Sequence, residues 1–259
     1  MAALELLRIK GERQKIVLVT GSSRGIGFDI ASRFLNDGHQ VILNGRNEEQ
    51  LKTASKLLSG TAFKVADVSE PLEAQGLVDF VIKTWGRLDV LVCNVGDGRS
   101  VPGGKETLAD WQKCFNVNLW SVTNMVESAL NELEKSKGCI VCISSICGME
   151  YIQGAPVTYS VAKAALNAYV KASSVHLGKK GIRINAIAPG NIIFEGSVWE
   201  RKLAEDPANV EKMLTNCVPL SRLGKAHEVS EVVNFLASSS ATFVTGTVWK
   251  CDGGQTRSF

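Results

Sequence analysis

The sequence predicts an α/β protein built on a doubly wound parallel sheet of about seven strands, with helices on both faces. Two observations support this prediction. Short runs rich in β-branched residues alternate with longer amphipathic stretches along the whole chain, which is typical of right-handed βαβ units. The short runs are almost continuously apolar, which indicates strands covered on both faces. No linker of biased composition divides residues 1–259, so we expect a single domain.

Turn residues bound each predicted element, as at Asp37-Gly38, Lys137-Gly138 and Lys180-Gly181. Strands are predicted for residues 15–20, 40–44, 88–93, 138–144 and 182–186, with weaker candidates at 62–65 and 247–250. Helices are predicted for residues 26–37, 48–58, 71–86, 110–136, 160–178 and 226–238.

Composition and charge exclude several classes of protein. Of the 259 residues, 45% are apolar and 21% are charged, which excludes intrinsic disorder. The net charge is only +3 and no block of like charge occurs, so we expect neither nucleic acid nor a membrane surface as a partner. The longest uncharged stretch, residues 232–249, is too polar for a membrane helix. With no secretory pattern and no disulfide-like cysteine spacing, we expect a cytoplasmic protein.

Cys139 and Cys142 form a C-x-x-C spacing that could indicate zinc or redox chemistry. The run around them is strand-like, and residues three apart on a strand point to opposite faces. We therefore expect both thiols in the core. His39, His176 and His227 show no ligand spacing either, so no metal site is predicted.

The first predicted strand leads into the glycine pattern GSSRGIG at residues 21–27, and a predicted helix follows. Gly21 permits a tight turn, Gly25 lets the backbone approach a pyrophosphate, and Gly27 lets the helix pack closely on the strand. The helix N-terminus offers unpaired N–H groups to phosphate. The pattern therefore predicts a Rossmann-type dinucleotide site. Its expected cofactor-binding residues are Gly21, Ser23, Arg24, Gly25, Ile26 and Gly27.

The end of the second strand predicts which dinucleotide binds. An acidic residue there would accept hydrogen bonds from the ribose 2′-hydroxyl of NAD, but the position holds Gly45, followed by Arg46. Arg46 and Arg24 carry guanidinium groups suited to a 2′-phosphate, so the sequence predicts NADP(H). Further cofactor contacts are expected where the third and fourth strands end, at Asp67, Val68, Asn94 and Gly96.

Tyr159 and Lys163 lie four residues apart, on one face of a helix. Ser145 ends the fifth strand 14 residues before Tyr159. Hydride transfer to a ketone leaves an alkoxide that must be protonated, and a nearby ammonium group lowers the pKa of a tyrosine that supplies the proton. A serine hydroxyl can hold the substrate oxygen. These residues predict interconversion of a ketone and a secondary alcohol.

The chain resembles the short-chain dehydrogenase/reductases over about residues 14–254, through motifs that occur in the family's order. They are TGSSRGIG, CNVG, VNLW, ISS, YSVAK, INAIAPG, PLSRLG and CDGG.

The resemblance implies a catalytic tetrad. Tyr159 would be the acid/base, Lys163 would hold the nicotinamide ribose and lower the tyrosine pKa, and Ser145 would orient the carbonyl. Asn118 would support a water that connects Lys163 to solvent. Cofactor contacts are also implied for Tyr159, Lys163, Pro189, Gly190 and Ile192, the last through its backbone. The resemblance further implies a homotetramer, with the helices over residues 110–136 and from 160 in one interface.

Three departures from the family pattern stand out. Cys93 and Val95 replace smaller or more polar residues of the family's N-N-A-G. Ser145 lies one residue further from Tyr159 than is common, which implies a small insertion at residues 149–156 and leaves Ser144 as a lesser candidate. The threonine common after Pro189-Gly190 is missing.

The sequence leaves the substrate open. PLSRLG and CDGG resemble 3-oxoacyl-(acyl-carrier-protein) reductases, which reduce a β-ketoacyl thioester. Two polar and aromatic loops instead resemble those of reductases that act on keto-sugars in polysaccharide or surface-sugar biosynthesis. They include Arg99, Glu195, Trp199 and Lys202. A non-catalytic NADP-sensing protein on the same fold is a third reading, disfavoured because the whole tetrad is present.

Overall fold

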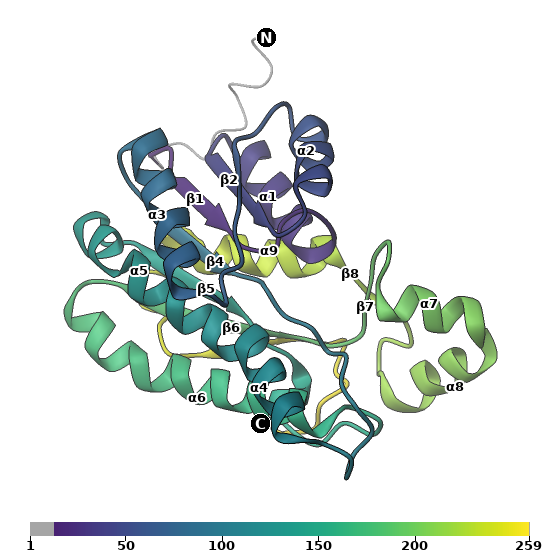
Figure 1. Ribbon diagram of the computed structural model, residues 1–259. Helices are drawn as coiled ribbons and strands as arrows, with labels where there is room; N and C mark the ends of the chain where they lie inside the picture. The colour runs from purple at the N-terminus through teal and green to yellow at the C-terminus, as the bar shows by residue number, and fades with distance from the viewer. Residues whose placement is uncertain (1–12, 259) are drawn as a thin grey trace.

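A seven-stranded, all-parallel sheet forms the centre of the molecule (Figure 1), in a computed structural model that describes residues 13–258. The strand order is β3-β2-β1-β4-β5-β6-β9, which confirms the predicted fold class. The strands are β1 (Ile16–Val19), β2 (Gln40–Gly45), β3 (Phe63–Val65), β4 (Val90–Cys93), β5 (Cys139–Ile143), β6 (Arg183–Pro189) and β9 (Val248–Cys251). A second, two-stranded sheet pairs β7 (Ile192–Ile193) with β8 (Gly224–Lys225).

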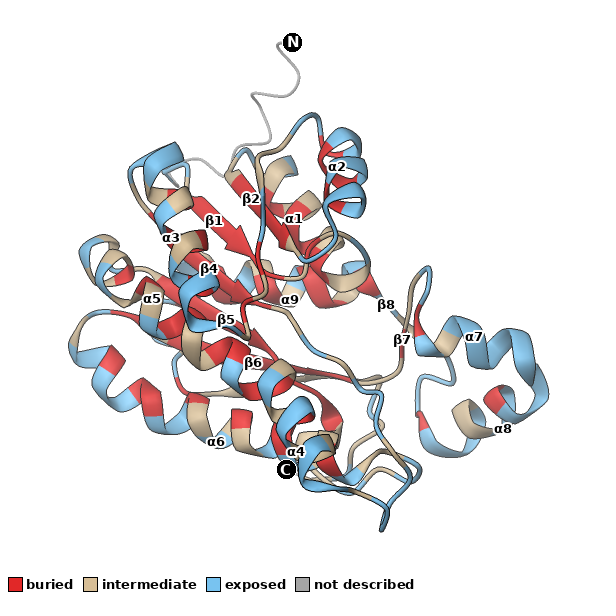
Figure 2. Ribbon diagram, viewed as in Figure 1, coloured by how far each residue is buried: buried red, intermediate tan, exposed pale blue. Residues whose placement is uncertain are grey.

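Helices cover both faces of the central sheet, whose inner strands are buried while the edge strands β3 and β9 are partly exposed (Figures 1 and 2). The helices are α1 (Gly25–Asn36), α2 (Glu48–Leu57), α3 (Pro71–Trp85), α4 (Leu108–Phe115), α5 (Ser121–Ser136), α6 (Val157–Lys179), α7 (Val198–Glu205), α8 (Pro207–Cys217) and α9 (Ala226–Ala237). Shorter helical turns are η2 (Asn116–Trp120), η3 (Ile146–Gly148) and η4 (Ser239–Ala241).

Two apolar clusters hold the layers together, one on each face of the sheet. Leu77, Met125 and Leu166 belong to the cluster under α3, α5 and α6. Ile30 and Leu51 belong to the other, under α1, α2 and α9. Parallel strands paired in register bring their carboxyl ends to one edge of the sheet, which is where ligands bind in such folds.

The prediction of one helix over residues 110–136 was wrong. Helix α4 begins at Leu108, because Thr107 and Asp110 form a capping box. It runs into the π-helical turn η2, and only then does α5 begin. The apolar period continues across all three elements, so the sequence pattern did not reveal the extra residue in the turn.

Helices α7 and α8 were not predicted. They project from the body of the molecule as a separate arm (Figure 1). Helix α7 has no buried residue and α8 buries only Val210, so neither has the apolar stripe that identifies a helix in a sequence. Side chains of Ser197 and Asp206 cap their N-termini instead, accepting hydrogen bonds from backbone N–H groups.

Cys139 and Cys142 are both buried and belong to opposite apolar clusters, as predicted for a strand. Within residues 13–258, no cluster of three or more His, Cys, Asp or Glu side chains has the arrangement of a metal site. Among the helices of this part of the chain, none is long and apolar enough to cross a membrane.

The turn η3 packs directly on the backbone of α6 at Gly148. A Cβ atom there would lie 2.5 Å from the carbonyl carbon of Lys163 and 2.8 Å from the backbone nitrogen of Ala164. Neither is the end of a flexible side chain. This contact sets the spacing between the end of β5 and the first turns of α6.

We predict that Gly148→Ala destabilises the fold by about 1–3 kcal/mol, because the new methyl group must displace backbone. Gly178→Ala, on the same α6, is the matched control: a Cβ atom at Gly178 meets nothing within 4 Å. Gly178 is the last residue but one of α6, where alanine should be tolerated and should stabilise by up to about 0.5–1 kcal/mol. Urea denaturation measures both. Equal stability of the two variants would contradict the close contact.

Candidate active site

The glycine loop between β1 and α1 has the geometry expected of a nucleotide-binding turn. Gly21 and Gly25 have φ angles of +61° and +59°, which side chains rarely adopt. A Cβ atom at Gly27 would lie 2.4 Å from the Gly21 carbonyl oxygen and 2.5 Å from Nδ2 of Asn94. The loop thus brings backbone without side chains to the N-terminus of α1, which suits the diphosphate of a dinucleotide.

Asn94, predicted to contact the cofactor, ties the end of β4 to this loop. Its Nδ2 donates hydrogen bonds to the carbonyl oxygens of Thr20 (3.1 Å) and Gly21 (2.9 Å). Its backbone N–H donates to the Thr20 hydroxyl. The Asn94 amide thus fixes the shape of the glycine loop from a neighbouring strand.

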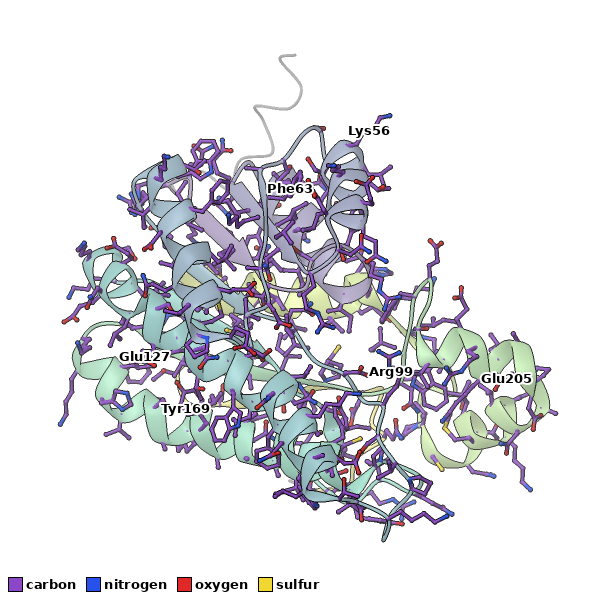
Figure 3. All side chains as sticks on the ribbon, viewed as in Figure 1. Lys56, Phe63, Arg99, Glu127, Tyr169 and Glu205 are labelled. Carbon is purple, nitrogen blue, oxygen red and sulfur yellow. The ribbon has the colours of Figure 1, made fainter. Side chains whose placement is uncertain are left out.

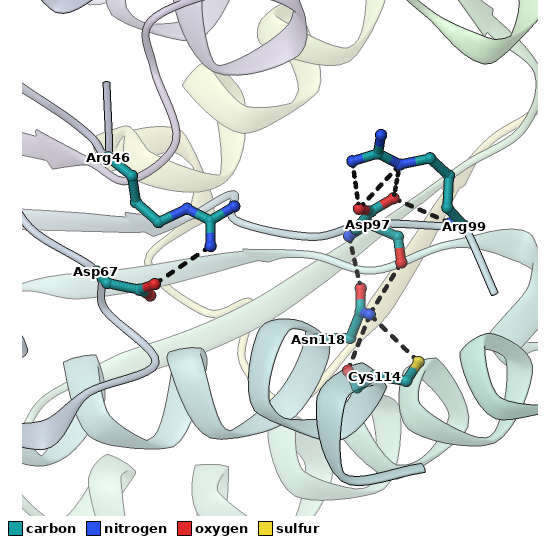
Figure 4. Close-up of polar contacts among 6 residues, drawn as sticks. All are labelled: Arg46, Asp67, Asp97, Arg99, Cys114 and Asn118. Atoms are coloured by element: carbon teal, nitrogen blue, oxygen red, sulfur yellow. Dashed lines mark hydrogen bonds and ion pairs between the residues drawn. The ribbon is translucent and has the colours of Figure 1, made fainter. Parts of the chain in front are cut away.

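Arg46 and Asp67 face each other beyond the ends of β2 and β3 (Figure 4). Nη1 of Arg46 lies 3.2 Å from Oδ2 of Asp67, while the Arg46 side chain is 70% exposed. Burial opposes ionisation of Asp67, but hydrogen bonds from Ser69 and Arg46 outweigh it, so the pKa of Asp67 is lowered. Arg24 is exposed in the glycine loop, and Val68 is buried.

The segment after β7 passes across the glycine loop, a contact that the sequence did not reveal. A Cβ atom at Gly25 would lie 2.6 Å from the ring of Phe194. One at Gly196 would lie 2.7 Å from Nη1 of Arg24. Phe194 stands in the run where the threonine common to the family is missing, so the departure lies directly against the nucleotide loop.

Pro189, Gly190 and Ile192 lie where β6 ends, at the same edge of the sheet. The Gly190 N–H donates to the Cys251 carbonyl at 3.0 Å, and a Cβ atom at Gly190 would lie 2.9 Å from the Cα of Asp252. Ile192 is buried and pairs with Gly224. These contacts hold the turn close to the end of the sheet.

The four residues of the predicted tetrad converge from different elements. Tyr159 and Lys163 lie on α6, and the Lys163 Nζ is 5.8 Å from the Tyr159 ring centroid. Ser145 follows β5 and lies close enough to the Tyr159 hydroxyl to lower its pKa. A Cβ atom at Gly96 would lie 3.1 Å from both Oδ1 of Asn118 and Nζ of Lys163. Gly96 therefore lies where the Asn118 and Lys163 side chains meet.

Ser144 is held away from this cluster. Its hydroxyl forms a 2.6 Å hydrogen bond with Oδ1 of Asn167, whose Nδ2 donates to the Gly148 carbonyl. The Ser145 hydroxyl instead accepts a hydrogen bond from the Cys147 N–H at 3.2 Å. Of the two serines, Ser145 faces Tyr159 and Ser144 is engaged in packing η3 against α6.

Asn118 lies fully buried in η2, where its side chain holds the loop after β4 (Figure 4). Oδ1 accepts from the Asp97 N–H at 3.1 Å, and Nδ2 donates to the carbonyl oxygens of Asp97 and Cys114, each at 3.0 Å. A π-helical turn often marks a functional site, because it redirects a side chain. Neither Asp97 nor Cys114 was singled out from the sequence as a partner of Asn118.

The electrostatics of the site differ from the expectation for Tyr159. Burial raises the pKa of Tyr159 above its ordinary value, although the hydrogen bond with Ser145 lowers it. Lys163 was expected to lower this pKa, but burial has the largest effect and the pKa is raised. Burial also lowers the pKa of Lys163 to about 8. The Lys163 ammonium donates a hydrogen bond to the Ile143 carbonyl at 2.9 Å.

Comparison with known proteins gives matches over nearly the whole chain. Residues 21–256 match the family model of enoyl-(acyl carrier protein) reductase. The chain is 35% identical to the L-fucose dehydrogenase of Bos taurus, covering 93% of this chain and 88% of that one. It is also 35% identical to the 3-oxoacyl-(acyl-carrier-protein) reductase FabG of Chlamydia muridarum, covering 93% and 97%.

Solved structures agree with this assignment. The L-sorbose reductase of Gluconobacter frateurii, complexed with NADPH and L-sorbose, matches with a TM-score of 0.89 at 26% identity, over 96% of this chain and 99% of that one. Three further matching structures are complexes with NADP or NADPH. The comparisons thus support the prediction of NADP(H). Together with the glycine loop and the Tyr159–Lys163 arrangement, they show that the chain belongs to the short-chain dehydrogenase/reductase family.

Proposed function

We propose that this chain reduces a ketone to a secondary alcohol with NADPH, and that Tyr159 supplies the proton. The observation that carries the proposal is the meeting of Tyr159, Ser145 and Lys163 at the carboxyl edge of the sheet that also bears the glycine loop. When bound, NADPH supplies the hydride. Residues of the glycine loop with Arg24 and Arg46 would hold its phosphates, and the turn at Pro189, Gly190 and Ile192 would contact its nicotinamide end.

Each of the reacting side chains has a distinct task in this proposal. Ser145 accepts a hydrogen bond from the Cys147 N–H, which leaves its own hydroxyl proton free to be donated to the substrate oxygen. Tyr159 protonates the alkoxide. Lys163, whose pKa of about 8 keeps it mostly charged at neutral pH, stabilises the tyrosinate that remains. Asn118 holds the loop after β4 in place beside them.

The raised pKa of Tyr159 suits this residue to act as a general acid in ketone reduction. A tyrosine that retains its proton at neutral pH is ready to act as a general acid, whereas alcohol oxidation requires it as a base. We therefore expect ketone reduction to proceed readily near neutral pH and alcohol oxidation to require alkaline conditions.

We expect Tyr159→Phe to lower the turnover of ketone reduction by about 10²–10⁴-fold, the usual contribution of general acid catalysis. The substitution removes one hydroxyl and little packing. Thermal unfolding and NADPH fluorescence titration should therefore match the wild type. A variant that keeps most of its reductase activity would show that another group supplies the proton.

The cofactor preference provides a second test. Replacing Arg46 by alanine should weaken NADPH binding by roughly 10- to 150-fold, because a charged hydrogen bond contributes about 1.5–3 kcal/mol. Binding of NADH should change little. Lys56→Ala, which removes one positive charge from α2, is the control and should leave both dissociation constants unchanged. Equal affinity of the wild type for NADH and NADPH would contradict the assignment.

For the substrate we propose a 3-oxoacyl thioester, with a keto-sugar as the alternative. Relatives of both kinds match the chain at the same 35% identity. Two of the cationic groups in the loops that suggested a sugar have partners within their own loop. The Arg99 guanidinium donates two hydrogen bonds to the Asp97 carboxylate, from Nε to Oδ1 at 2.9 Å and from Nη2 to Oδ2 at 2.7 Å. The Lys202 ammonium lies 4.6 Å from the Trp199 ring centroid. A site built for a sugar would need such groups free for hydrogen bonds.

The two substrate readings predict opposite results in a substrate panel. With NADPH we expect kcat/KM for the acetoacetyl thioester of N-acetylcysteamine to exceed that for L-sorbose by at least about tenfold, since polar groups left unpaired by the wrong substrate are costly. Trp199→Ala should leave thioester turnover unchanged. Efficient sugar turnover that falls in Trp199→Ala, with NADPH binding intact, would establish the alternative.

We also propose a homotetramer, as the family resemblance implies. Apolar side chains of the helices assigned to the interface are exposed in the single chain: Leu108, Trp120, Val157, Val161 and Val175. Their burial between subunits would account for exposed apolar surface on α4, α6 and the η2 turn.

A further inference from the structure

Asp97 and Arg99 form an ion pair in the loop after β4 (Figure 4), and Figure 3 labels Arg99 on the whole chain. The Arg99 guanidinium binds the Asp97 carboxylate in a bidentate manner, with Nε 2.9 Å from Oδ1 and Nη2 2.7 Å from Oδ2. The Arg99 backbone N–H also donates to Oδ1, at 2.9 Å. The Arg99 side chain is 73% exposed, and that of Asp97 is half as exposed. The guanidinium therefore covers the carboxylate from the solvent side.

The backbone of this loop is fixed relative to Tyr159. Asn118 clamps residue 97 by accepting from its N–H and donating to its carbonyl oxygen. The next residue, Gly98, lies against the tyrosine ring: a Cβ atom there would be 3.8 Å from Cζ, the carbon that bears the hydroxyl. The loop that bears Asp97 and Arg99 is thus held beside the Tyr159 ring.

We propose that Asp97 and Arg99 are positioning residues for proton transfer: the Asp97 carboxylate acts electrostatically on the Tyr159 hydroxyl, and Arg99 limits that effect by neutralising it. The inference rests on the proposed function, because it takes Tyr159 as the proton donor. It assigns the pair an electrostatic role that needs no contact with substrate or cofactor.

Charged and titratable groups face Tyr159 from each element packed around it. They are Lys163 on α6, Cys147 on η3, Cys114 on α4 and Asp97 on the loop. Asp97 raises the pKa of Tyr159, because a negative charge nearby disfavours tyrosinate. Burial opposes ionisation of Asp97, but hydrogen bonds from Arg99 and the charge of Lys113 lower its pKa below the ordinary value. Asp97 is therefore ionised at neutral pH.

The two single variants should move the pH profile in opposite directions. Arg99→Ala leaves the carboxylate unneutralised, so tyrosinate forms at higher pH. The alkaline limb of ketone reduction and the rising limb of alcohol oxidation should both move up by about 0.5 pH unit or more. Asp97→Asn removes the negative charge, and both limbs should move down. Its Oδ1 can still accept from the Arg99 N–H, and the backbone bonds to Asn118 do not involve the side chain.

The double variant Asp97→Asn/Arg99→Ala provides the decisive comparison. Because the effects of two fixed charges add, the double variant, which loses both charges of a neutral pair, should have limbs between those of the two single variants and close to those of the wild type. Arg99→Lys keeps the charge and should fall between wild type and Arg99→Ala. Lys135→Ala removes one unit of charge from an exposed ion pair with Glu132 and should leave the limbs in place.

The measurement is the pH dependence of kcat/KM with NADPH and the best substrate of the panel. Deuterated NADPH confirms that the hydride step is observed. Limbs of Arg99→Ala that coincide with wild type, or a raised KM without displaced limbs, would overturn the inference; the second result would make Arg99 a substrate ligand. Tyr159→Phe separates the two proposals: if it stays active, the assignment of Tyr159 fails whatever the loop variants do.

Discussion

The burial of the Lys163 ammonium group is the constraint on which the rest of the site depends. A charged group that is only 2% exposed is stable only when it is held by polar partners. The Ile143 carbonyl at the end of β5 supplies one, and the closeness of Gly96 to both Lys163 and Asn118 brings the loop after β4 to the same point. The Lys163 side chain thus contacts both the end of β5 and the loop after β4 from its place on α6. Tyr159 lies one helical turn before Lys163 on α6, so its position is fixed as well.

Close backbone contacts make this convergence possible. Gly148 lets η3 lie on the backbone of α6, and Gly27 lets α1 lie on the glycine loop. The amide of Asn94 links that loop to the end of β4, and the amide of Asn118 links the end of β4 to η2. One set of contacts therefore runs from the nucleotide loop to the reacting tyrosine.

The arm formed by α7 and α8 is built on a different principle. Its helices bury almost nothing and are held by side-chain caps, so they contribute little to the core. The chain that enters this arm places Phe194 on Gly25, against the nucleotide loop. Variation in such a segment can alter the ligand without disturbing the sheet, which is why family membership defines the reaction class and leaves the substrate to experiment.

The central sheet with its seven strands, the glycine loop and the placement of Tyr159 and Lys163 on one helix face could all be predicted from the sequence. Each follows from a local pattern of apolar, glycine or polar residues. It also determined that Cys139 and Cys142 lie on opposite faces, since a strand has a period of two. The tertiary structure alone decided the rest. Helices α7 and α8 have no apolar stripe, and the π-helical turn at Asn118 interrupts no pattern. The choice of Ser145 over Ser144 depends on the hydrogen bond between Ser144 and Asn167. The direction of the shift in the Tyr159 pKa depends on how deeply the fold buries this side chain. Both are set by residues far apart in the chain.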